Sequence, residues 1–248
     1  MIIYGKNPVR ELLADPRSRI DEIVVAKDSR KEGDHEILSL AKKRGVRVQL
    51  LPRDAVTRLT GTTSHQGVAA RVPEWEYSSL GDIIELSRSK LEKLLVVILD
   101  HLEDPQNLGA IIRTADVLGA HGVVIPKDRA ASVTPAVIKA SAGAVNHVPV
   151  ARVTNISNVI EELKREGVWI VGADAEAPKP VYEEDLGKVD IGLVIGNEGR
   201  GLSHKVKEKC DYLVSIPRTG KVSSLNASVS AGILIYEIMR QRGKFESL

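Results

Sequence analysis

The chain has 248 residues, 43% of them hydrophobic, which is enough for one large core or two modest ones. Its apolar runs are shorter than the roughly 18 residues of a membrane span, and its N-terminus lacks the apolar segment of a secretory signal. The single cysteine, Cys210, excludes an internal disulfide and a cysteine-rich zinc site. We therefore expect a cytoplasmic protein that has no membrane partner.

Charge is unevenly distributed along the chain, although the formal net charge is only +2. Residues 1–72 hold 14 Lys and Arg against 9 Asp and Glu, a net charge of +5, whereas residues 73–248 have a net charge of −3. A basic N-terminal part favours a polyanionic partner, but charge alone leaves an ordinary solvated surface equally open. Aromatic residues make up 3% of the chain, which argues against stacking of many bases.

Residues 1–72 alternate strand and helix signals and predict a small α/β domain. Asn7 and Pro8 mark the start of a helix that continues to Ala14, because proline is favoured at the first helical position. Hydrophobic periodicity places the other elements. After a short opening strand, we expect strands at residues 22–26, 46–50 and 67–72 and helices at residues 35–44 and 54–59.

Residues 73–91 are predicted to be a linker and a connecting helix, which covers residues 80–90. A second domain, residues 92–248, again alternates strands and helices, and this predicts a parallel sheet with helices on both faces. The run 95–99 is apolar throughout, as is typical of a strand buried on both faces. The other predicted strands are 122–125, 148–151, 168–173, 191–196 and 212–216, and the predicted helices are 107–118, 134–140, 156–165, one opened by Ser203, and 225–240.

Three polar loops follow apolar strands in the second domain, at residues 100–109, 195–203 and 216–226. Ligands bind at the carboxyl ends of strands in open α/β sheets, so we expect the functional site at these loops. The glycines of the second loop lack the dinucleotide-binding spacing, and the third loop lacks the Walker pattern. The second loop is interpreted either as a ligand loop or as a plain turn into a helix.

Individual loop residues have structural as well as functional interpretations. Asp104 or Asn107 can cap the helix that follows them, and Arg113 can be an ordinary solvated side chain. If the second loop were only a turn into a helix, the presence of the charged residue Glu198 in it would have no explanation. The histidines lack metal-ligand spacing, and Ser224 has no identifiable histidine partner. We therefore expect neither a metal nor a covalent intermediate.

Together the loops resemble the three motifs of the SpoU (TrmH-like) RNA ribose 2′-O-methyltransferases. The matching segments are residues 107–114, 195–202 and 216–228, in the same order and with similar spacing. Residues 3–9 and 63–68 also resemble the substrate-binding domain of the bacterial 23S rRNA guanosine-2′-O-methyltransferases. The resemblance therefore extends over nearly the whole chain.

The resemblance implies a SPOUT-type α/β fold, in which a parallel sheet carries a C-terminal trefoil knot and is preceded by a small L30e-like RNA-binding domain. It implies an S-adenosylmethionine-dependent enzyme without a metal, which acts as a homodimer on the ribose 2′-hydroxyl of a guanosine in 23S rRNA. Open alternatives are a tRNA or another rRNA as substrate, and a non-catalytic RNA-binding protein on the same scaffold. A different nucleotide-binding α/β enzyme is disfavoured, because the dinucleotide-binding and Walker patterns are missing.

Residue roles follow from the same resemblance. Arg113 is the group expected to activate the hydroxyl, but an arginine pKa of about 12 or above makes it a poor base. Stabilising the developing alkoxide is the alternative role, with another group accepting the proton. The residues expected to shape the catalytic pocket are Asn107, Glu198, Ser224 and Asn226. Those expected to bind the methyl donor are Gly196, Asn197, Ile216, Leu225 and Asn226.

Overall fold

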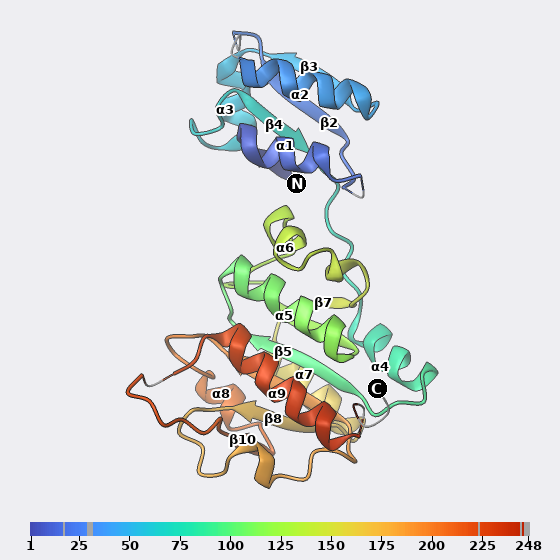
Figure 1. The fold of residues 1–248 in the computed structure, drawn as a ribbon, viewed down its shortest axis with the longest axis vertical. Coiled ribbons are helices and arrows are strands. Elements are labelled where there is room, and N and C mark those ends of the chain that lie inside the picture. The colour runs from blue at the N-terminus through green and yellow to red at the C-terminus, as the bar shows by residue number, and fades with distance from the viewer. Residues whose placement is uncertain (17, 29–31, 223, 244, 246–248) are drawn as a thin grey trace. The chain divides into compact units, whose positions relative to one another are not determined.

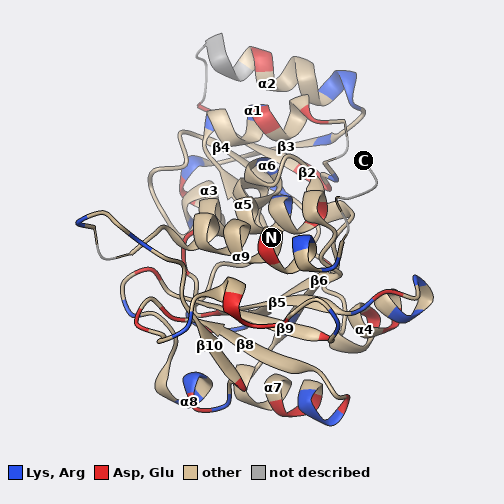
Figure 2. Ribbon diagram, turned by 60° about the horizontal axis from the view of Figure 1, so that its bottom comes forward, with Lys and Arg blue, Asp and Glu red and all other residues tan. Residues whose placement is uncertain are grey.

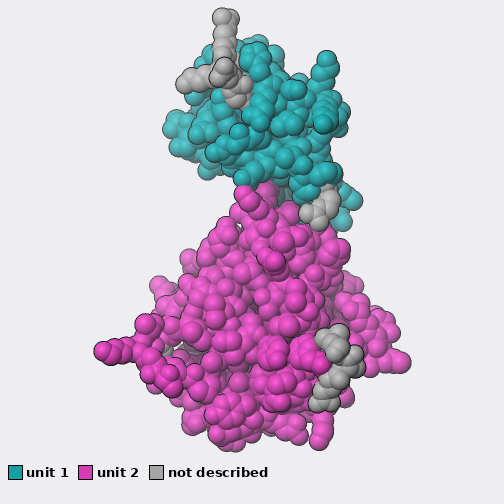
Figure 3. Space-filling model, in the orientation of Figure 1, with its two compact units in different colours: residues 1–76 teal, residues 77–248 magenta. Residues whose placement is uncertain are grey.

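The computed structural model describes residues 1–16, 18–28, 32–222, 224–243 and 245, with only the backbone for residues 32–34. The chain separates into two compact units, residues 1–76 and 77–248 (Figure 3). Each unit has its own β-sheet and its own hydrophobic core. Among the described residues, no helix combines the length and the apolar character needed to cross a membrane.

The first unit is built on a four-stranded sheet with the order β1-β4-β2-β3 (Figure 1). Strand β2 pairs in parallel with β3 and antiparallel with β4, which is itself antiparallel to β1. The elements are β1 (Ile2–Tyr4), α1 (Lys6–Ala14), β2 (Glu22–Ala26), α2 (Glu32–Lys43), β3 (Arg47–Leu51), α3 (Arg53–Thr60) and β4 (Val68–Arg71).

Both faces of β2 are buried in this unit. Ile23 and Val25 belong to the core cluster that includes α1 and α2, whereas Val24 and Ala26 pack in a separate cluster with Val56 of α3. Alternate strand residues point to opposite faces, so helices on both sides require an unbroken apolar run. This explains why the sequence is apolar from residue 23 to residue 26.

The two N-terminal segments that show the resemblance lie together in the first unit. The side-chain Oε1 of Gln66 accepts the backbone N–H of Lys6 at 3.0 Å, and the N–H of Gly5 donates to the carbonyl of Val68 at 3.0 Å. Gly5 has a φ of +95°, a backbone conformation that favours glycine. These bonds fix the start of α1 against the loop that precedes β4.

The second unit contains a six-stranded sheet with the order β10-β8-β9-β5-β6-β7, and every pairing is parallel. The chain builds β5, β6 and β7 outward in one direction and then returns to add β8, β9 and β10 on the other side. The order therefore reverses between β5 and β9, and such a reversal opens a crevice at the carboxyl ends of the strands. The strands are β5 (Leu95–Asp100), β6 (Gly122–Pro126), β7 (Val150–Val153), β8 (Trp169–Ala173), β9 (Ile191–Gly196) and β10 (Tyr212–Val214).

Helices cover both faces of this sheet (Figure 1). Val96 and Ile98 of β5 pack in a core with α4, α7 and α8, and the neighbouring residues of the strand point to the opposite face. On that opposite face α5 and α9 lie side by side. The helices are α4 (Leu80–Ser89), α5 (Pro105–Leu118), α6 (Pro135–Ala140), α7 (Ile156–Arg165), α8 (His204–Lys207) and α9 (Ala227–Gln241), with short 3-10 turns η1 (Ala144–Asn146) and η2 (Val181–Glu183).

The helix predicted at residues 80–90 as a connection is instead part of the second unit. Leu80, Ile83 and Ile84 of α4 are buried in that unit's core. A capping box fixes the start of the helix, because the Ser79 hydroxyl accepts the N–H of Asp82 while the Asp82 carboxylate accepts the N–H of Ser79. The division between the units falls after residue 76, so α4 is counted with the second unit.

Arg242 fixes the end of α9 at the amino edge of the sheet. Its guanidinium donates to the carbonyls of Lys93, Leu94 and Val189 at 2.7, 2.9 and 3.1 Å. Burial lowers the pKa of Arg242 to about 10, so the side chain is still charged at neutral pH. Both ends of α9 are therefore held, because its start lies in the polar group described next.

Candidate active site

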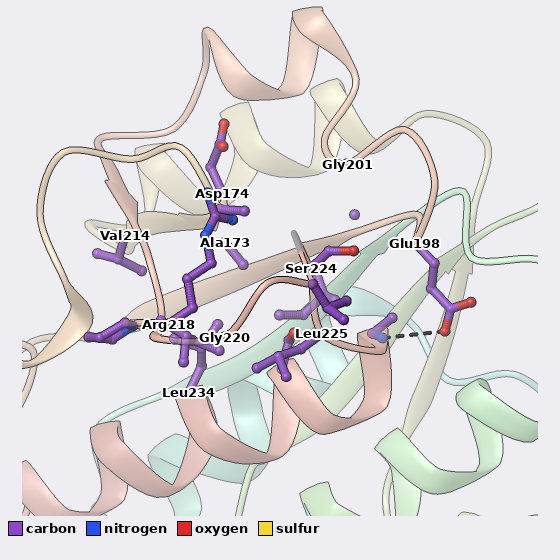
Figure 4. A pocket seen from close by; sticks show the side chains of 18 of the residues that line it. Ala173, Asp174, Glu198, Gly201, Val214, Arg218, Gly220, Ser224, Leu225 and Leu234 are labelled. Atoms are coloured by element: carbon purple, nitrogen blue, oxygen red, sulfur yellow. Dashed lines mark hydrogen bonds between the residues drawn. The ribbon is translucent and has the colours of Figure 1, made fainter.

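The three polar loops meet at the carboxyl edge of the second sheet, where the structure has a cavity of about 460 Å³. The walls come from the ends of β8, β9 and β10 and from the start of α9 (Figure 4). This volume lies within the range of small-molecule sites. The lining includes six residues predicted from the sequence: Gly196, Asn197, Glu198, Ile216, Ser224 and Leu225.

Glu198 connects the three loops through one carboxylate oxygen. Its Oε1 accepts hydrogen bonds from Asn107 Nδ2 at 2.5 Å and from Asn226 Nδ2 at 2.6 Å. It also accepts the backbone N–H of Ala227 at 3.3 Å, the bond drawn as a dashed line in Figure 4. Asn226 Nδ2 also donates to Asn107 Oδ1 at 3.0 Å. Residues far apart in sequence are thus joined into one polar group, defined here as the Asn107–Glu198–Asn226 triad.

Asn226 also caps α9. Its Oδ1 accepts the N–H groups of Ser228 and Val229 at 2.9 and 3.3 Å, which satisfies two of the free donors at the start of the helix. Because the amide oxygen faces the helix, the amide nitrogen must face Glu198. The helix cap therefore orients the side chain within the triad.

The loop after β9 folds back on itself as a tight wall of the cavity. Asn197 and Gly201 exchange two backbone hydrogen bonds of 3.1 and 2.8 Å. A Cβ at Gly196 would lie 2.2 Å from the carbonyl carbon of Gly201, so only glycine allows this approach. Asn197 Nδ2 donates to the His101 carbonyl, and its Oδ1 accepts the N–H of Gly199. The Asn197 side chain thus supports the loop.

Sequence reasoning missed the part of the cavity that follows β8. Asp174 lines it, forms an ion pair with Lys207 and accepts the N–H of Glu176. The hydrogen bond from Lys207 lowers the pKa of Asp174. Arg218, from the loop after β10, forms an ion pair of 2.6 Å with Glu176. The available signal was the position of Asp174 at the carboxyl end of a buried parallel strand.

Arg113 is exposed on α5 and does not line the cavity of this chain. Its side chain forms no hydrogen bond or ion pair with any described residue. It lies one helical turn before Val117, and so on the same face of α5, where Val117 is 73% exposed. The loop residue Ser223 lies outside the described residues, whereas its neighbour Ser224 is exposed at the cavity.

Other reactive groups are remote or unsuitable. Burial raises the pKa of the Cys210 thiol to about 12, so it is not ionised at neutral pH. Within the described part of the chain, no three His, Cys, Asp or Glu side chains are arranged to hold a metal ion.

Residues 94–236 match the SpoU rRNA Methylase family, and residues 2–78 match the RNA 2'-O ribose methyltransferase substrate-binding domain. The chain belongs to the SpoU rRNA methylase family. It is therefore an RNA methyltransferase of the SpoU and TrmH group, and its first unit is the substrate-binding domain of that group.

Some relatives match this SpoU-family chain over nearly its full length, and others match a smaller part of it. YacO of Bacillus subtilis, named for the TrmH family of tRNA/rRNA methyltransferases, is 47% identical over 97% of the chain and 95% of its own length. The SpoU methyltransferase AviRb of Streptomyces viridochromogenes, solved in complex with AdoMet, superposes with a TM-score of 0.64 at 29% identity, covering 98% of this chain and 91% of that one. The A. aeolicus TrmH/SpoU tRNA-modifying enzyme covers 65% of this chain and 83% of its own, with a TM-score of 0.56 and 30% identity.

Proposed function

We propose that this protein transfers a methyl group from S-adenosylmethionine to the ribose 2′-hydroxyl of a guanosine in 23S rRNA, in the cytoplasm. The observation that carries the proposal is the Asn107–Glu198–Asn226 triad at the mouth of the cavity above the carboxyl edge of the sheet. The AviRb complex with AdoMet supports this choice of donor.

The residues of the cavity fit this donor. An adenosyl group needs an apolar slot with free backbone groups, and Ile195, Ile216, Leu225 and Leu234 provide apolar walls. Gly196 lines the cavity and, without a Cβ, allows the loop after β9 to fold back as its wall. Carboxylates favour a nearby sulfonium cation, and one is present at Glu198. When bound there, the donor supplies an electrophilic methyl group.

The chain's own residues orient the nucleophile and stabilise its charge. A ribose hydroxyl is a weak nucleophile that develops negative charge as it loses its proton. Arg113 is suited to stabilise this alkoxide, since a guanidinium stays charged and donates several hydrogen bonds. Glu198 orients the side-chain amide of Asn107 through a hydrogen bond. The oriented amide and Ser224 position the ribose. Positioning alone can lower the barrier by several kcal/mol.

We further propose that the chain ends in a trefoil knot and begins with an L30e-like domain. The segment between β10 and α9 runs from the edge strand across the carboxyl edge to the start of α9 beside Glu198. Because this segment passes next to the folded-back loop after β9, it supports the proposal that the C-terminal part of the chain is threaded through a loop. Alternating helices around the sheet β1-β4-β2-β3 support the assignment of the first unit.

The apolar face of α9 supports a homodimer. Val229, Ile233 and Tyr236 recur at intervals of four and three residues, so they share one face, and they are 48%, 38% and 50% exposed. Val117 of the adjacent α5 is 73% exposed. Contiguous exposed apolar groups of this kind mark an interface. A second copy docked here would also cover Arg113, which shares the face of Val117, and would bring that arginine toward the partner's site.

Ile233→Glu is expected to convert the dimer to a monomer, because a carboxylate would be buried without a counter-ion at the centre of this face. Light scattering after gel filtration should give half the wild-type mass, and methyl transfer should fall with it. Leu91→Glu is the control, since Leu91 is 95% exposed beyond the end of α4 and is not part of this apolar face, so the mass should stay unchanged. A wild-type mass for the Ile233 variant would contradict this interface.

The first unit is suited to contact RNA through its unpaired basic side chains. Figure 2 shows both signs of charge interleaved along α4 and α7 of the second unit, whereas residues 1–72 have a net charge of +5. Several arginines of the first unit are ion-paired, as Arg58 is with Asp54 and Arg71 with Glu22. Within the described residues of this unit, the basic side chains with neither an ion pair nor a hydrogen bond are Arg19, Lys27, Lys42, Lys43 and Arg47, whereas Arg44 donates to three backbone carbonyls.

Two measurements test the proposed function. Calorimetry with S-adenosylmethionine should show about one site per subunit, since one cavity of this kind serves each chain. Mapping of 2′-O-methyl groups in RNA from cells with and without the gene should show the loss of one guanosine methylation in 23S rRNA. Loss from a tRNA instead would keep the chemistry and change the substrate, and no donor binding at all would overturn the proposal.

A further inference from the structure

A second hollow lies on the other side of the folded-back loop from the donor cavity. Its volume is about 390 Å³, and it opens over the ends of β5 and β9, where the strand order reverses. Asn197 and Gly201 line both hollows, so the loop of residues 197–201 is their common wall. The full lining is Asp100, His101, Glu103, Arg129, Asn197, Arg200, Gly201 and Ser203.

The accessible charge of this second hollow is mainly positive. Arg129 and Arg200 are exposed, and neither forms a hydrogen bond or ion pair with another residue that the structure describes. The Asp100 carboxylate is buried and occupied, since its Oδ2 accepts the Ser203 N–H at 2.7 Å and its Oδ1 bonds His101 Nδ1 at 2.6 Å. Two guanidinium groups therefore face a single exposed carboxylate, that of Glu103.

Arg129 is held in place by its neighbours. Two residues before it, the N–H of Lys127 donates to the Val153 carbonyl at 2.7 Å, and two residues after it, the N–H of Ala131 donates to the Leu102 carbonyl at 2.8 Å. The loop between β6 and α6 is thus anchored on both sides of Arg129. A charged group on a fixed backbone binds a ligand with less loss of entropy than one on a free loop.

We propose that this hollow binds the RNA sugar–phosphate backbone next to the target nucleotide, with Arg129 and Arg200 contacting phosphate. The inference rests on the proposed function. A guanidinium matches phosphate oxygens in geometry as well as charge. The lining contains no Phe, Tyr or Trp on which a base could stack, and its one imidazole, that of His101, is bonded to Asp100, so backbone contact is favoured over base recognition. An RNA strand bound in this hollow would lie against the loop of residues 197–201, which is also a wall of the donor cavity.

The test is Arg129→Ala in the full-length protein, with Arg165→Ala as a charge-matched control. Arg165 is exposed at the end of α7, where the chain turns toward the amino edge of the sheet. Unmodified 23S rRNA, 16S rRNA and tRNA transcripts are offered to the wild type, and the one that it methylates best is used throughout. RNA affinity is measured over a series of salt concentrations, donor affinity by calorimetry, and kcat and KM by methyl transfer.

Arg129→Ala is expected to weaken RNA binding about tenfold and to lower the salt slope by about one, as the loss of one phosphate contact requires. KM for RNA should rise accordingly, with kcat at saturating RNA and donor affinity unchanged. Arg129→Lys should recover part of the RNA affinity, and the Arg165 variant should match the wild type.

Three results would overturn the inference. They are unchanged RNA affinity in Arg129→Ala, a fall in donor affinity together with RNA affinity, and an equal loss in the Arg165 variant. A joint fall in donor and RNA affinity would show that Arg129 acts by supporting the loop of residues 197–201 and not by contacting RNA. The proposed function fails separately, when the wild type itself binds no donor or methylates none of the three transcripts.

Discussion

Arg113→Ala is expected to abolish methyl transfer while S-adenosylmethionine still binds. The guanidinium is exposed on α5, outside the donor cavity, so its removal leaves the walls of that cavity intact. Loss of a group that stabilises a developing anion typically lowers kcat on the order of 100- to 1000-fold. Arg113→Lys should also be poor, because an ammonium cannot reproduce the fork of donors.

Single-turnover methyl transfer with bound RNA measures this effect, and calorimetry follows the donor. Asp116→Asn on the same helix is the control for a changed surface charge, because Asp116 is exposed and belongs to neither cavity. Near-wild-type turnover in Arg113→Ala would show that another group stabilises the alkoxide.

Gly196→Ala is expected to weaken donor binding and to lower stability. The added methyl carbon would lie 2.2 to 2.5 Å from backbone atoms of Gly201 and Leu202, so the folded-back loop has to move. Overpacking of this kind costs about 1–3 kcal/mol. Because the displaced loop walls the cavity and carries Glu198, donor affinity should fall by about tenfold or more.

Gly220→Ala is the matched control for this substitution. Gly220 also lines the cavity, but a Cβ there would meet nothing within 4 Å. The control should keep the donor affinity and the melting temperature of the wild type. Calorimetry and thermal unfolding compare the two variants, and equal behaviour would mean that the loop adapts to a side chain at residue 196.

The alternation of strands and helices is predictable from the sequence because each buried strand requires a short apolar run. The run 95–99 becomes β5, and its neighbours follow the predicted positions closely. The order of the strands within the sheet is not predictable in this way, because it depends on which edge of the sheet each returning strand joins. Only that order brings β5 beside β9, and so Asn107 beside Glu198.

Asn107 shows where residue type alone is ambiguous. Asp104 and Asn107 are both good helix caps, and the structure shows that Asp104 caps α5 through the N–H of Gln106. Asn107 is inside the helix, 6% exposed, and bonded to Glu198, so its interpretation as a cap was wrong. Pro105 was the available signal, since proline favours the first helical position. For Asp174 the residue type gave no signal, and only its position at the carboxyl end of β8 pointed to the cavity.

Asn226 both caps α9 and donates to Glu198, and these two roles respond differently to chemical ageing of the side chain. Deamidation would convert this side chain to Asp, which caps a helix as well as Asn does, so α9 would keep its start. The amide nitrogen that donates to Glu198 and Asn107 would, however, become a second carboxylate oxygen beside Oε1 of Glu198. One attraction would turn into a repulsion between like charges. An aged molecule of this kind would keep the cap of α9 but lose the hydrogen bonds that join the Asn107–Glu198–Asn226 triad.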